Sequence, residues 1–153
     1  MRNYSTEKIF NQAKLLLPHG ESLHVIESVL AFDEQSICCQ SFEKKPSSMC
    51  IVDDLGQRLL MTVSSVEFIA QAAAIGSIMR SILRDDMRAR QGFVIRVKNM
   101  KIHQNRIKDM TSLLINAAWC GTQSAAYEVC GSVCDTSNPQ QVFCEGSLSI
   151  LEF

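Results

Sequence analysis

Two polar side chains stand out in the most apolar helix that the sequence predicts. Between Val66 and Ile78 the only strongly polar residues are Glu67 and Gln71, and residues four apart share one side of a helix. A carboxylic acid among apolar neighbours can keep a proton at neutral pH, as a general acid must. A second interpretation is structural: Ser64 and Glu67 have the spacing of a capping box, in which Glu67 binds the backbone N–H of Ser64.

A general base is the other group that proton chemistry needs. Of the three histidines, His19 is the best candidate, because Pro18 restricts its loop and imidazole titrates near neutral pH. A lone histidine is more often structural. His24 is a competitor on a predicted strand, and His103 lies in a basic region where we expect it to be exposed.

These side chains must be positioned by a small number of elements. The patterns predict a helix from Ser5 or Thr6 to Leu17, strands over 23–32, 35–42 and 49–52, one long helix over 64–90, and strands over 93–103, 111–119, 124–134 and 141–153. Turns are expected at 53–58 and at 120–123. The sequence therefore predicts one α+β domain over residues 1–153, with a curved antiparallel sheet around a single central helix.

Composition and charge restrict the partners. A 46% hydrophobic and 20% charged chain is typical of globular proteins. Residues 80–108 contain nine Lys or Arg and two Asp, which predicts either a solvated surface or a docking patch for an acidic or phosphate-bearing partner. Nucleic acid is disfavoured, since only Phe93 interleaves with these charges.

The cysteines and the apolar runs indicate the compartment. The seven cysteines include no C-x-x-C pair, so we expect reduced, structural thiols. We expect no membrane span and no signal peptide, and hence a cytoplasmic location.

Two segments resemble a known family. "LLPHGESLHVIESVLAFDE" (16–34) is similar to the N-terminal segment of 3-hydroxyacyl-[acyl carrier protein] dehydratases of the FabZ/FabA type, and "VEFIAQAAA" (66–74) resembles the start of their central helix. The FabZ segment Gly-His-Phe-Pro is missing, since residues 50–65 contain no histidine and no proline. The chain therefore resembles most closely the ApeP-like branch, which is associated with aryl-polyene biosynthesis. That branch has methionine and aspartate where Leu23 and Glu27 stand.

The resemblance implies a hotdog fold and a lyase that dehydrates a 3-hydroxyacyl thioester to a trans-2-enoyl thioester in fatty-acid or polyene-type biosynthesis. By carry-over, His19 is the base and Glu67 the acid, and Gln71 orients Glu67 or contacts the substrate. The family builds its site across a dimer, so His19 is expected to meet Glu67 of a partner chain in a homodimer or a heterodimer.

The resemblance also implies an acyl carrier protein as partner, with the substrate on its phosphopantetheine arm, and no metal or other cofactor. The basic residues 80–108 then become a docking surface for the acidic carrier protein. Two alternatives remain open. One is an acyl thioesterase on the same fold, with Glu67 activating water, and the other is a non-catalytic subunit that pairs with an active dehydratase.

Overall fold

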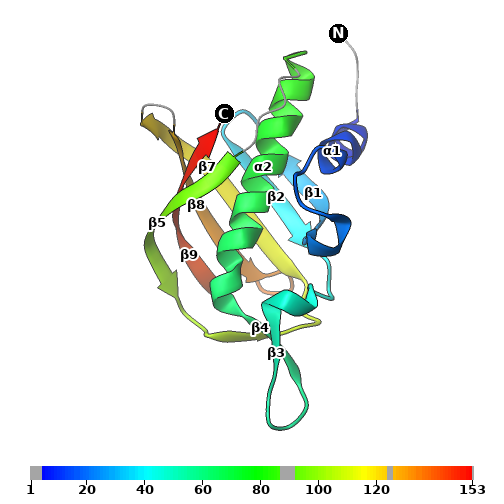
Figure 1. Ribbon diagram of the computed structural model, residues 1–153, viewed down its shortest axis with the longest axis vertical. Coiled ribbons are helices and arrows are strands. Elements are labelled where there is room, and N and C mark those ends of the chain that lie inside the picture. The colour runs from blue at the N-terminus through cyan, green and yellow to red at the C-terminus, as the bar shows by residue number, and fades with distance from the viewer. Residues whose placement is uncertain (1–4, 87–91, 124–125, 153) are drawn as a thin grey trace.

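The fold is a six-stranded antiparallel sheet wrapped around one helix. The computed structural model describes residues 5–86, 92–123 and 126–152. The large sheet has the order β1-β2-β7-β8-β9-β5. Its strands are β1 (Ile26–Phe32), β2 (Ser36–Ser41), β7 (Leu113–Gln123), β8 (Ala126–Asp135), β9 (Val142–Glu152) and β5 (Gly92–Ile102). Figure 1 shows the helix α2 (Ser65–Leu83) lying across this sheet, with α1 (Thr6–Leu15) beside it.

The N-terminal helix α1 begins as its sequence predicts. The Ser5 side chain accepts a hydrogen bond from the Lys8 N–H at 3.3 Å, which satisfies one of the free donors of the first turn. Ile9, Phe10 and Ala13 are buried. This amphipathic helix therefore holds the chain against the core just before the segment that contains His19.

The central helix α2 differs from its prediction at both ends. A 3₁₀ turn (Thr62–Ser64) leads directly into it, so Ser64 has helical dihedral angles and its side chain makes no capping hydrogen bond within the described part of the chain. The capping-box interpretation of Glu67 is therefore wrong. The helix ends at Leu83, not at residue 90, because Asp85 adopts φ = 55°. The N–H groups of Asp85 and Asp86 bond back to Ile82 and Ser81, which is a Schellman motif.

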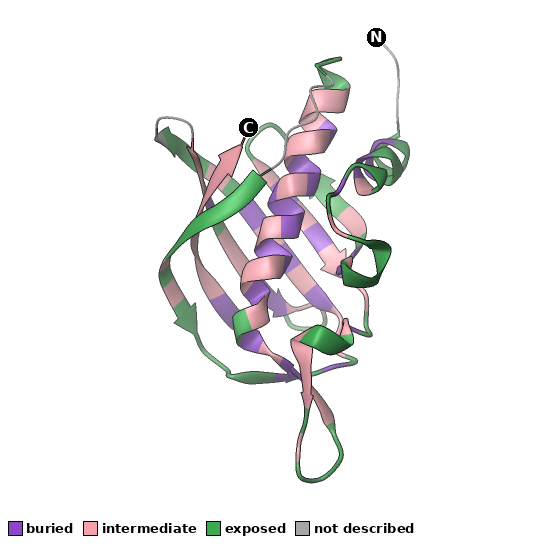
Figure 2. Ribbon diagram, in the orientation of Figure 1, coloured by how far each residue is buried: buried purple, intermediate pink, exposed green. Residues whose placement is uncertain are grey.

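The core lies between α2 and the inner face of the sheet. Phe68, Ile69, Ile75 and Met79 of α2 are almost fully buried, and Figure 2 shows the buried positions on α2 and on the strands behind it. Gly131 on β8 allows close approach, since a methyl group there would lie 2.4 Å from Cγ2 of Ile69. Burying most faces of one helix explains its nearly continuous apolar sequence.

We expected no apolar segment long enough to span a membrane, and this expectation is wrong for the segment that contains α2. The stretch Thr62–Leu83 is long and apolar enough to cross a membrane by length and composition, with a mean hydropathy of 1.4. In the structure it is the helix that the sheet surrounds, which accounts for that hydropathy without a membrane.

The structure has a second, three-stranded sheet, of which the sequence patterns predicted β3 (Cys50–Val52) and missed the other two strands. The sheet has the order β3-β4-β6, and the other two strands are β4 (Arg58–Met61) and β6 (Arg106–Lys108). The predicted turn at 53–58 is present and connects β3 to β4, which begins at Arg58. The β3–β4 hairpin projects from the body of the molecule (Figure 1). The turn predicted at 120–123 belongs to β7, which pairs with β8 along its whole length.

Lys45 connects the small sheet to the large one. Its buried Nζ donates hydrogen bonds to four backbone carbonyls, those of Phe42, Glu43, Asp109 and Thr111. Its backbone N–H donates to the Asp109 carboxylate, which also pairs with Arg58 at 3.2 Å. Burial lowers the pKa of Lys45 to about 8, so these carbonyls must compensate the ammonium for its lost hydration.

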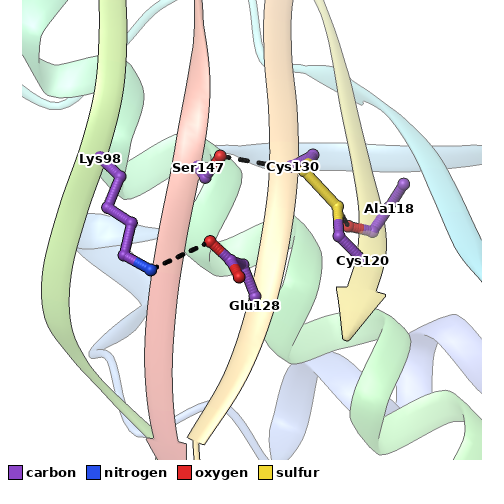
Figure 3. The surroundings of a disulfide bond; sticks show 6 residues. All are labelled: Lys98, Ala118, Cys120, Glu128, Cys130 and Ser147. Carbon is purple, nitrogen blue, oxygen red and sulfur yellow. Dashed lines mark hydrogen bonds and ion pairs between the residues drawn. A yellow bond between two sulfur atoms is a disulfide. The ribbon is translucent and has the colours of Figure 1, made fainter. Parts of the chain in front are cut away.

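The expectation of seven reduced cysteines is wrong for one pair. Cys120 and Cys130 form a disulfide between β7 and β8, with their Cα atoms 6.2 Å apart. The bond lies on the exposed face of the sheet, near the Lys98–Glu128 ion pair (Figure 3). The register shift between Trp119 and Gly121 offsets the two strands here, and sequence patterns do not reveal such a bulge. Five other cysteines are free thiols.

Candidate active site

His19 and Glu67 meet at the start of α2. The Nε2 atom of His19 lies 3.1 Å from Oε1 of Glu67, and the two side chains remain 32% and 36% exposed. Glu67 is held by the first full turn of α2, and His19 lies in the loop between α1 and a short 3₁₀ turn (Glu21–Leu23). The two groups that the sequence proposes for proton transfer are therefore in direct contact and accessible to a ligand.

The contact between His19 and Glu67 is made within one chain. The resemblance implied that His19 would face Glu67 of a partner protomer, and a contact across a dimer stays a prediction. The helix α1 packs beside α2. The loop after α1 therefore lies close enough to α2 to reach its first turn. The site therefore has both ionisable groups without a second chain.

Gln71 connects Glu67 to the loop that faces it. Its Nε2 donates to Oε1 of Glu67 at 2.8 Å and to the carbonyl of Leu23 at 2.9 Å, while its Oε1 accepts from the N–H of Val25 at 3.1 Å. Gln71 is fully buried and is not part of the cavity wall. The orienting contact with Glu67 is present as expected, and a contact of Gln71 with substrate stays a prediction.

One ring nitrogen of His19 remains without a bond. Its Nδ1 is buried and has no hydrogen-bond partner within residues 5–86, 92–123 and 126–152. The backbone carbonyl of His19 is engaged, because Nε2 of His24 lies 3.0 Å away. The imidazole thus has one buried nitrogen whose hydrogen-bonding capacity the described residues leave unused.

A cavity of about 560 Å³ extends from this pair along α2. His19 and Glu67 line it together with small side chains of α2, among them Ala70, Ala74 and Ser77. A volume of this size is typical of pockets for small molecules. The small side chains leave room for an elongated apolar chain beside the helix.

Aromatic side chains form the wall opposite the helix. Phe93, Trp119 and Tyr127 line the cavity. Trp119 packs closely on Gly76, where a methyl group would lie 2.5 Å from Cη2 of the indole. The Arg80 guanidinium stacks 3.5 Å from the centre of the same ring, which is a cation–π contact. Sequence patterns do not reveal this wall, because its three members lie on three separate strands, β5, β7 and β8.

The basic residues 80–108 do not form a single patch. Arg80 stacks on Trp119, Arg84 pairs with Glu34, and Lys98 pairs with Glu128. Arg88 and Arg90 lie outside the described residues. Four exposed cations have no ion-pair partner among the described residues, namely Arg96, Lys101, Arg106 and Lys108.

Comparison with known proteins identifies the family. The family model described as ApeP-like, ApeP dehydratase, matches residues 11–152. The chain belongs to the ApeP-like dehydratase family. Sequence comparison with curated proteins found no match.

Solved structures show that this ApeP-like chain has the hotdog fold. It is similar to the dehydratase heterocomplex ApeI:P from Xenorhabdus doucetiae, with a TM-score of 0.76 and 16% identity over 92% of this chain and 90% of that one. It also resembles zebra fish thioesterase superfamily member 2, with a TM-score of 0.66 and 12% identity over 98% and 99% of the two chains. A mutant of thioesterase PA1618 from Pseudomonas aeruginosa matches with a TM-score of 0.60 and 14% identity over 99% and 95%.

Proposed function

We propose that this ApeP-like protein dehydrates a 3-hydroxyacyl thioester carried by an acyl carrier protein, giving the trans-2-enoyl thioester. The observation that carries the proposal is the contact of His19 with Glu67 at one end of a long apolar cavity. One end of the cavity thus holds two groups that can exchange protons, and the rest can hold an acyl chain.

The two groups divide the reaction between them. His19 removes the proton from C2 of the acyl chain, the C2–H electron pair forms the C2=C3 double bond, and Glu67 delivers a proton to the departing 3-hydroxyl, which leaves as water. Gln71 fixes the Glu67 carboxyl group through its 2.8 Å hydrogen bond. Afterwards the protonated His19 can return its proton to Glu67 across their 3.1 Å contact, so the site is restored without a cofactor.

Backbone N–H groups at the start of a helix such as α2 can bind an oxygen like that of the thioester. The 3₁₀ turn uses the first of them, because the Ser65 N–H bonds to the carbonyls of Thr62 and Val63. We propose that a group from a second subunit polarises that oxygen.

The aromatic side chains of the cavity wall favour a flat acyl chain as substrate. Phe93, Trp119 and Tyr127 present rings to the cavity, and aromatic faces stack on conjugated or aryl groups. We propose a conjugated or aryl-terminated acyl chain, as in polyene biosynthesis, in the cytoplasm.

A second hotdog subunit is the proposed partner at β5. This edge strand exposes apolar side chains, including Phe93, Ile95 and Val97, at 46–57%. It also has Arg96, Lys98 and Lys101 but no carboxylate. Pairing with a second copy brings two such strands together, and like charges across a strand pair are destabilising. A heterologous partner with an acidic edge strand therefore fits β5 better than a copy of this chain.

The carrier protein is proposed to bind at the small sheet. Arg106 and Lys108 are exposed on β6, and Arg106 lies opposite Met61 of β4. The chain continues from Met61 through the 3₁₀ turn to Glu67. An acidic partner attracted to these cations would thus dock beside the end of the cavity where His19 and Glu67 lie.

Two single variants test the reaction. A trans-2-enoyl thioester is supplied to the complex purified through a tag on this chain, and its hydration is followed by loss of the conjugated-thioester absorbance. We expect H19A and E67Q each to lower the rate by at least about 100-fold. Activity that both variants retain would show that this chain is a non-catalytic subunit. Release of free thiol instead of hydration would favour the thioesterase.

A further inference from the structure

We infer that His24 is a positioning residue for the His19–Glu67 pair. Its Nε2 lies 3.0 Å from the backbone carbonyl of His19, and because a carbonyl only accepts hydrogen bonds, the His24 ring carries a proton on Nε2. His24 is half-buried and is not part of the cavity wall. It acts on substrate only through His19.

The hydrogen bond from His24 to the His19 carbonyl completes a closed set of contacts around the site. Gln71 binds the carbonyl of Leu23 and the N–H of Val25, which are the residues on either side of His24. Gln71 also binds Glu67, Glu67 contacts His19, and the His19 carbonyl returns to His24. The backbone of residue 24 is thus fixed to α2 by a buried amide, and its side chain extends that attachment to the loop of His19.

The loop depends on this attachment because its other backbone hydrogen bonds are local, from the Leu23 N–H to the Gly20 carbonyl and from the His24 N–H to the Glu21 carbonyl. Gly20 follows His19 directly and has no neighbouring atom within 4 Å of where a side chain would begin. Glu21, Ser22 and Leu23 are exposed. Without the bond from His24, fewer contacts hold the imidazole of His19 against Glu67. A shift of about 1 Å in a catalytic group can cost roughly 100-fold in rate.

Three variants separate a positioning role from a merely structural one. In H24Q the amide nitrogen can take the place of Nε2 and donate to the same carbonyl. H24F keeps a ring of similar size without a donor, and in H24N the amide nitrogen reaches only as far as the ring's Nδ1. We expect H24F and H24N to lower kcat for enoyl-thioester hydration about 10- to 100-fold with KM nearly unchanged, and H24Q to stay within about three-fold of the unaltered protein.

A spectroscopic measurement keeps the test independent of the reaction. The kinetic arm rests on the proposed function, but the imidazole ¹⁵N shifts of His19, assigned by their loss in H19A, report the His19–Glu67 contact in any case. We expect these shifts to move in H24F and H24N and to be retained in H24Q. Unmoved shifts in a folded H24F or H24N would overturn the inference, as would H24Q behaving like H24F. If the shifts respond as expected while no hydration is detected, the positioning role stands and the proposed function fails.

Discussion

Replacing Gln71 by leucine removes the clamp that joins α2 to the segment before β1. Leucine has a similar size, so the variant deletes hydrogen bonds with little change in packed volume. Three bonds are lost, to the Val25 N–H, the Leu23 carbonyl and the Glu67 carboxylate. Gln71 and Val25 are fully buried, so water cannot replace the amide oxygen that the Val25 N–H loses.

The expected cost follows from these three groups. A buried N–H left without an acceptor costs about 1–3 kcal/mol, and an ordinary hydrogen bond, such as that to Glu67, is worth about 0.5–1.5 kcal/mol. The Leu23 carbonyl is part-buried and can recover a bond to water, and the leucine side chain gains roughly 1 kcal/mol of apolar burial. The net loss in the free energy of unfolding is therefore about 1–3 kcal/mol, or roughly 3–10 °C in Tm.

Urea unfolding measures this loss directly. Trp119 is the single tryptophan of the chain and packs against α2, so its fluorescence reports unfolding of the core. Q140L is the matched control, because Gln140 is exposed and its replacement should change stability by less than about 0.5 kcal/mol. A Q71L protein that unfolds at the same urea concentration as Q140L would refute the clamp.

Three further outcomes are expected. K45M leaves four carbonyls without their donor and should lower the free energy of unfolding by about 2–4 kcal/mol. K44M, at an exposed position, is the control, and equal stability of K45M and K44M would contradict a stabilising role of the Lys45 ammonium. G76A places a methyl group 2.5 Å from Trp119, so the indole emission should shift as the ring moves; an unchanged spectrum would argue against the close packing. Burial raises the pKa of Cys39 to about 12, so this thiol should resist iodoacetamide in the native protein at pH 8 and react after unfolding. Peptide mass spectrometry measures the labelling, and a labelled Cys39 in the native protein would contradict its burial.

The fold was largely predictable because its signals are local. Ser5 caps α1 as its residue type suggests, and the apolar run after Glu67 corresponds to a helix buried on most sides. The ends of α2 were less predictable. The 3₁₀ turn before Ser65 made Ser64 helical, and an aspartate, Asp85, took the left-handed position that glycine usually occupies. Neither event has a strong sequence signature.

The site was predictable in its members and not in its geometry. His19 and Glu67 were selected by residue type and by family resemblance, and the structure brings them together within one chain. The strands β4 and β6 were missed because each is short and depends on a partner far away in sequence. The role of His24 was missed for the same reason. Its bond is to a backbone carbonyl, and only the folded loop shows which carbonyl that is.

We propose that this ApeP-like chain supplies the proton-transfer groups of a dehydratase, and NMR of a trans-2-enoyl thioester incubated in D₂O with the complex purified through this chain tests it. We expect a 3-hydroxyacyl thioester with one deuterium at C2, formed with the unaltered chain and not with E67Q. Free carboxylic acid and thiol, or the same deuterated product from the E67Q complex, would contradict it.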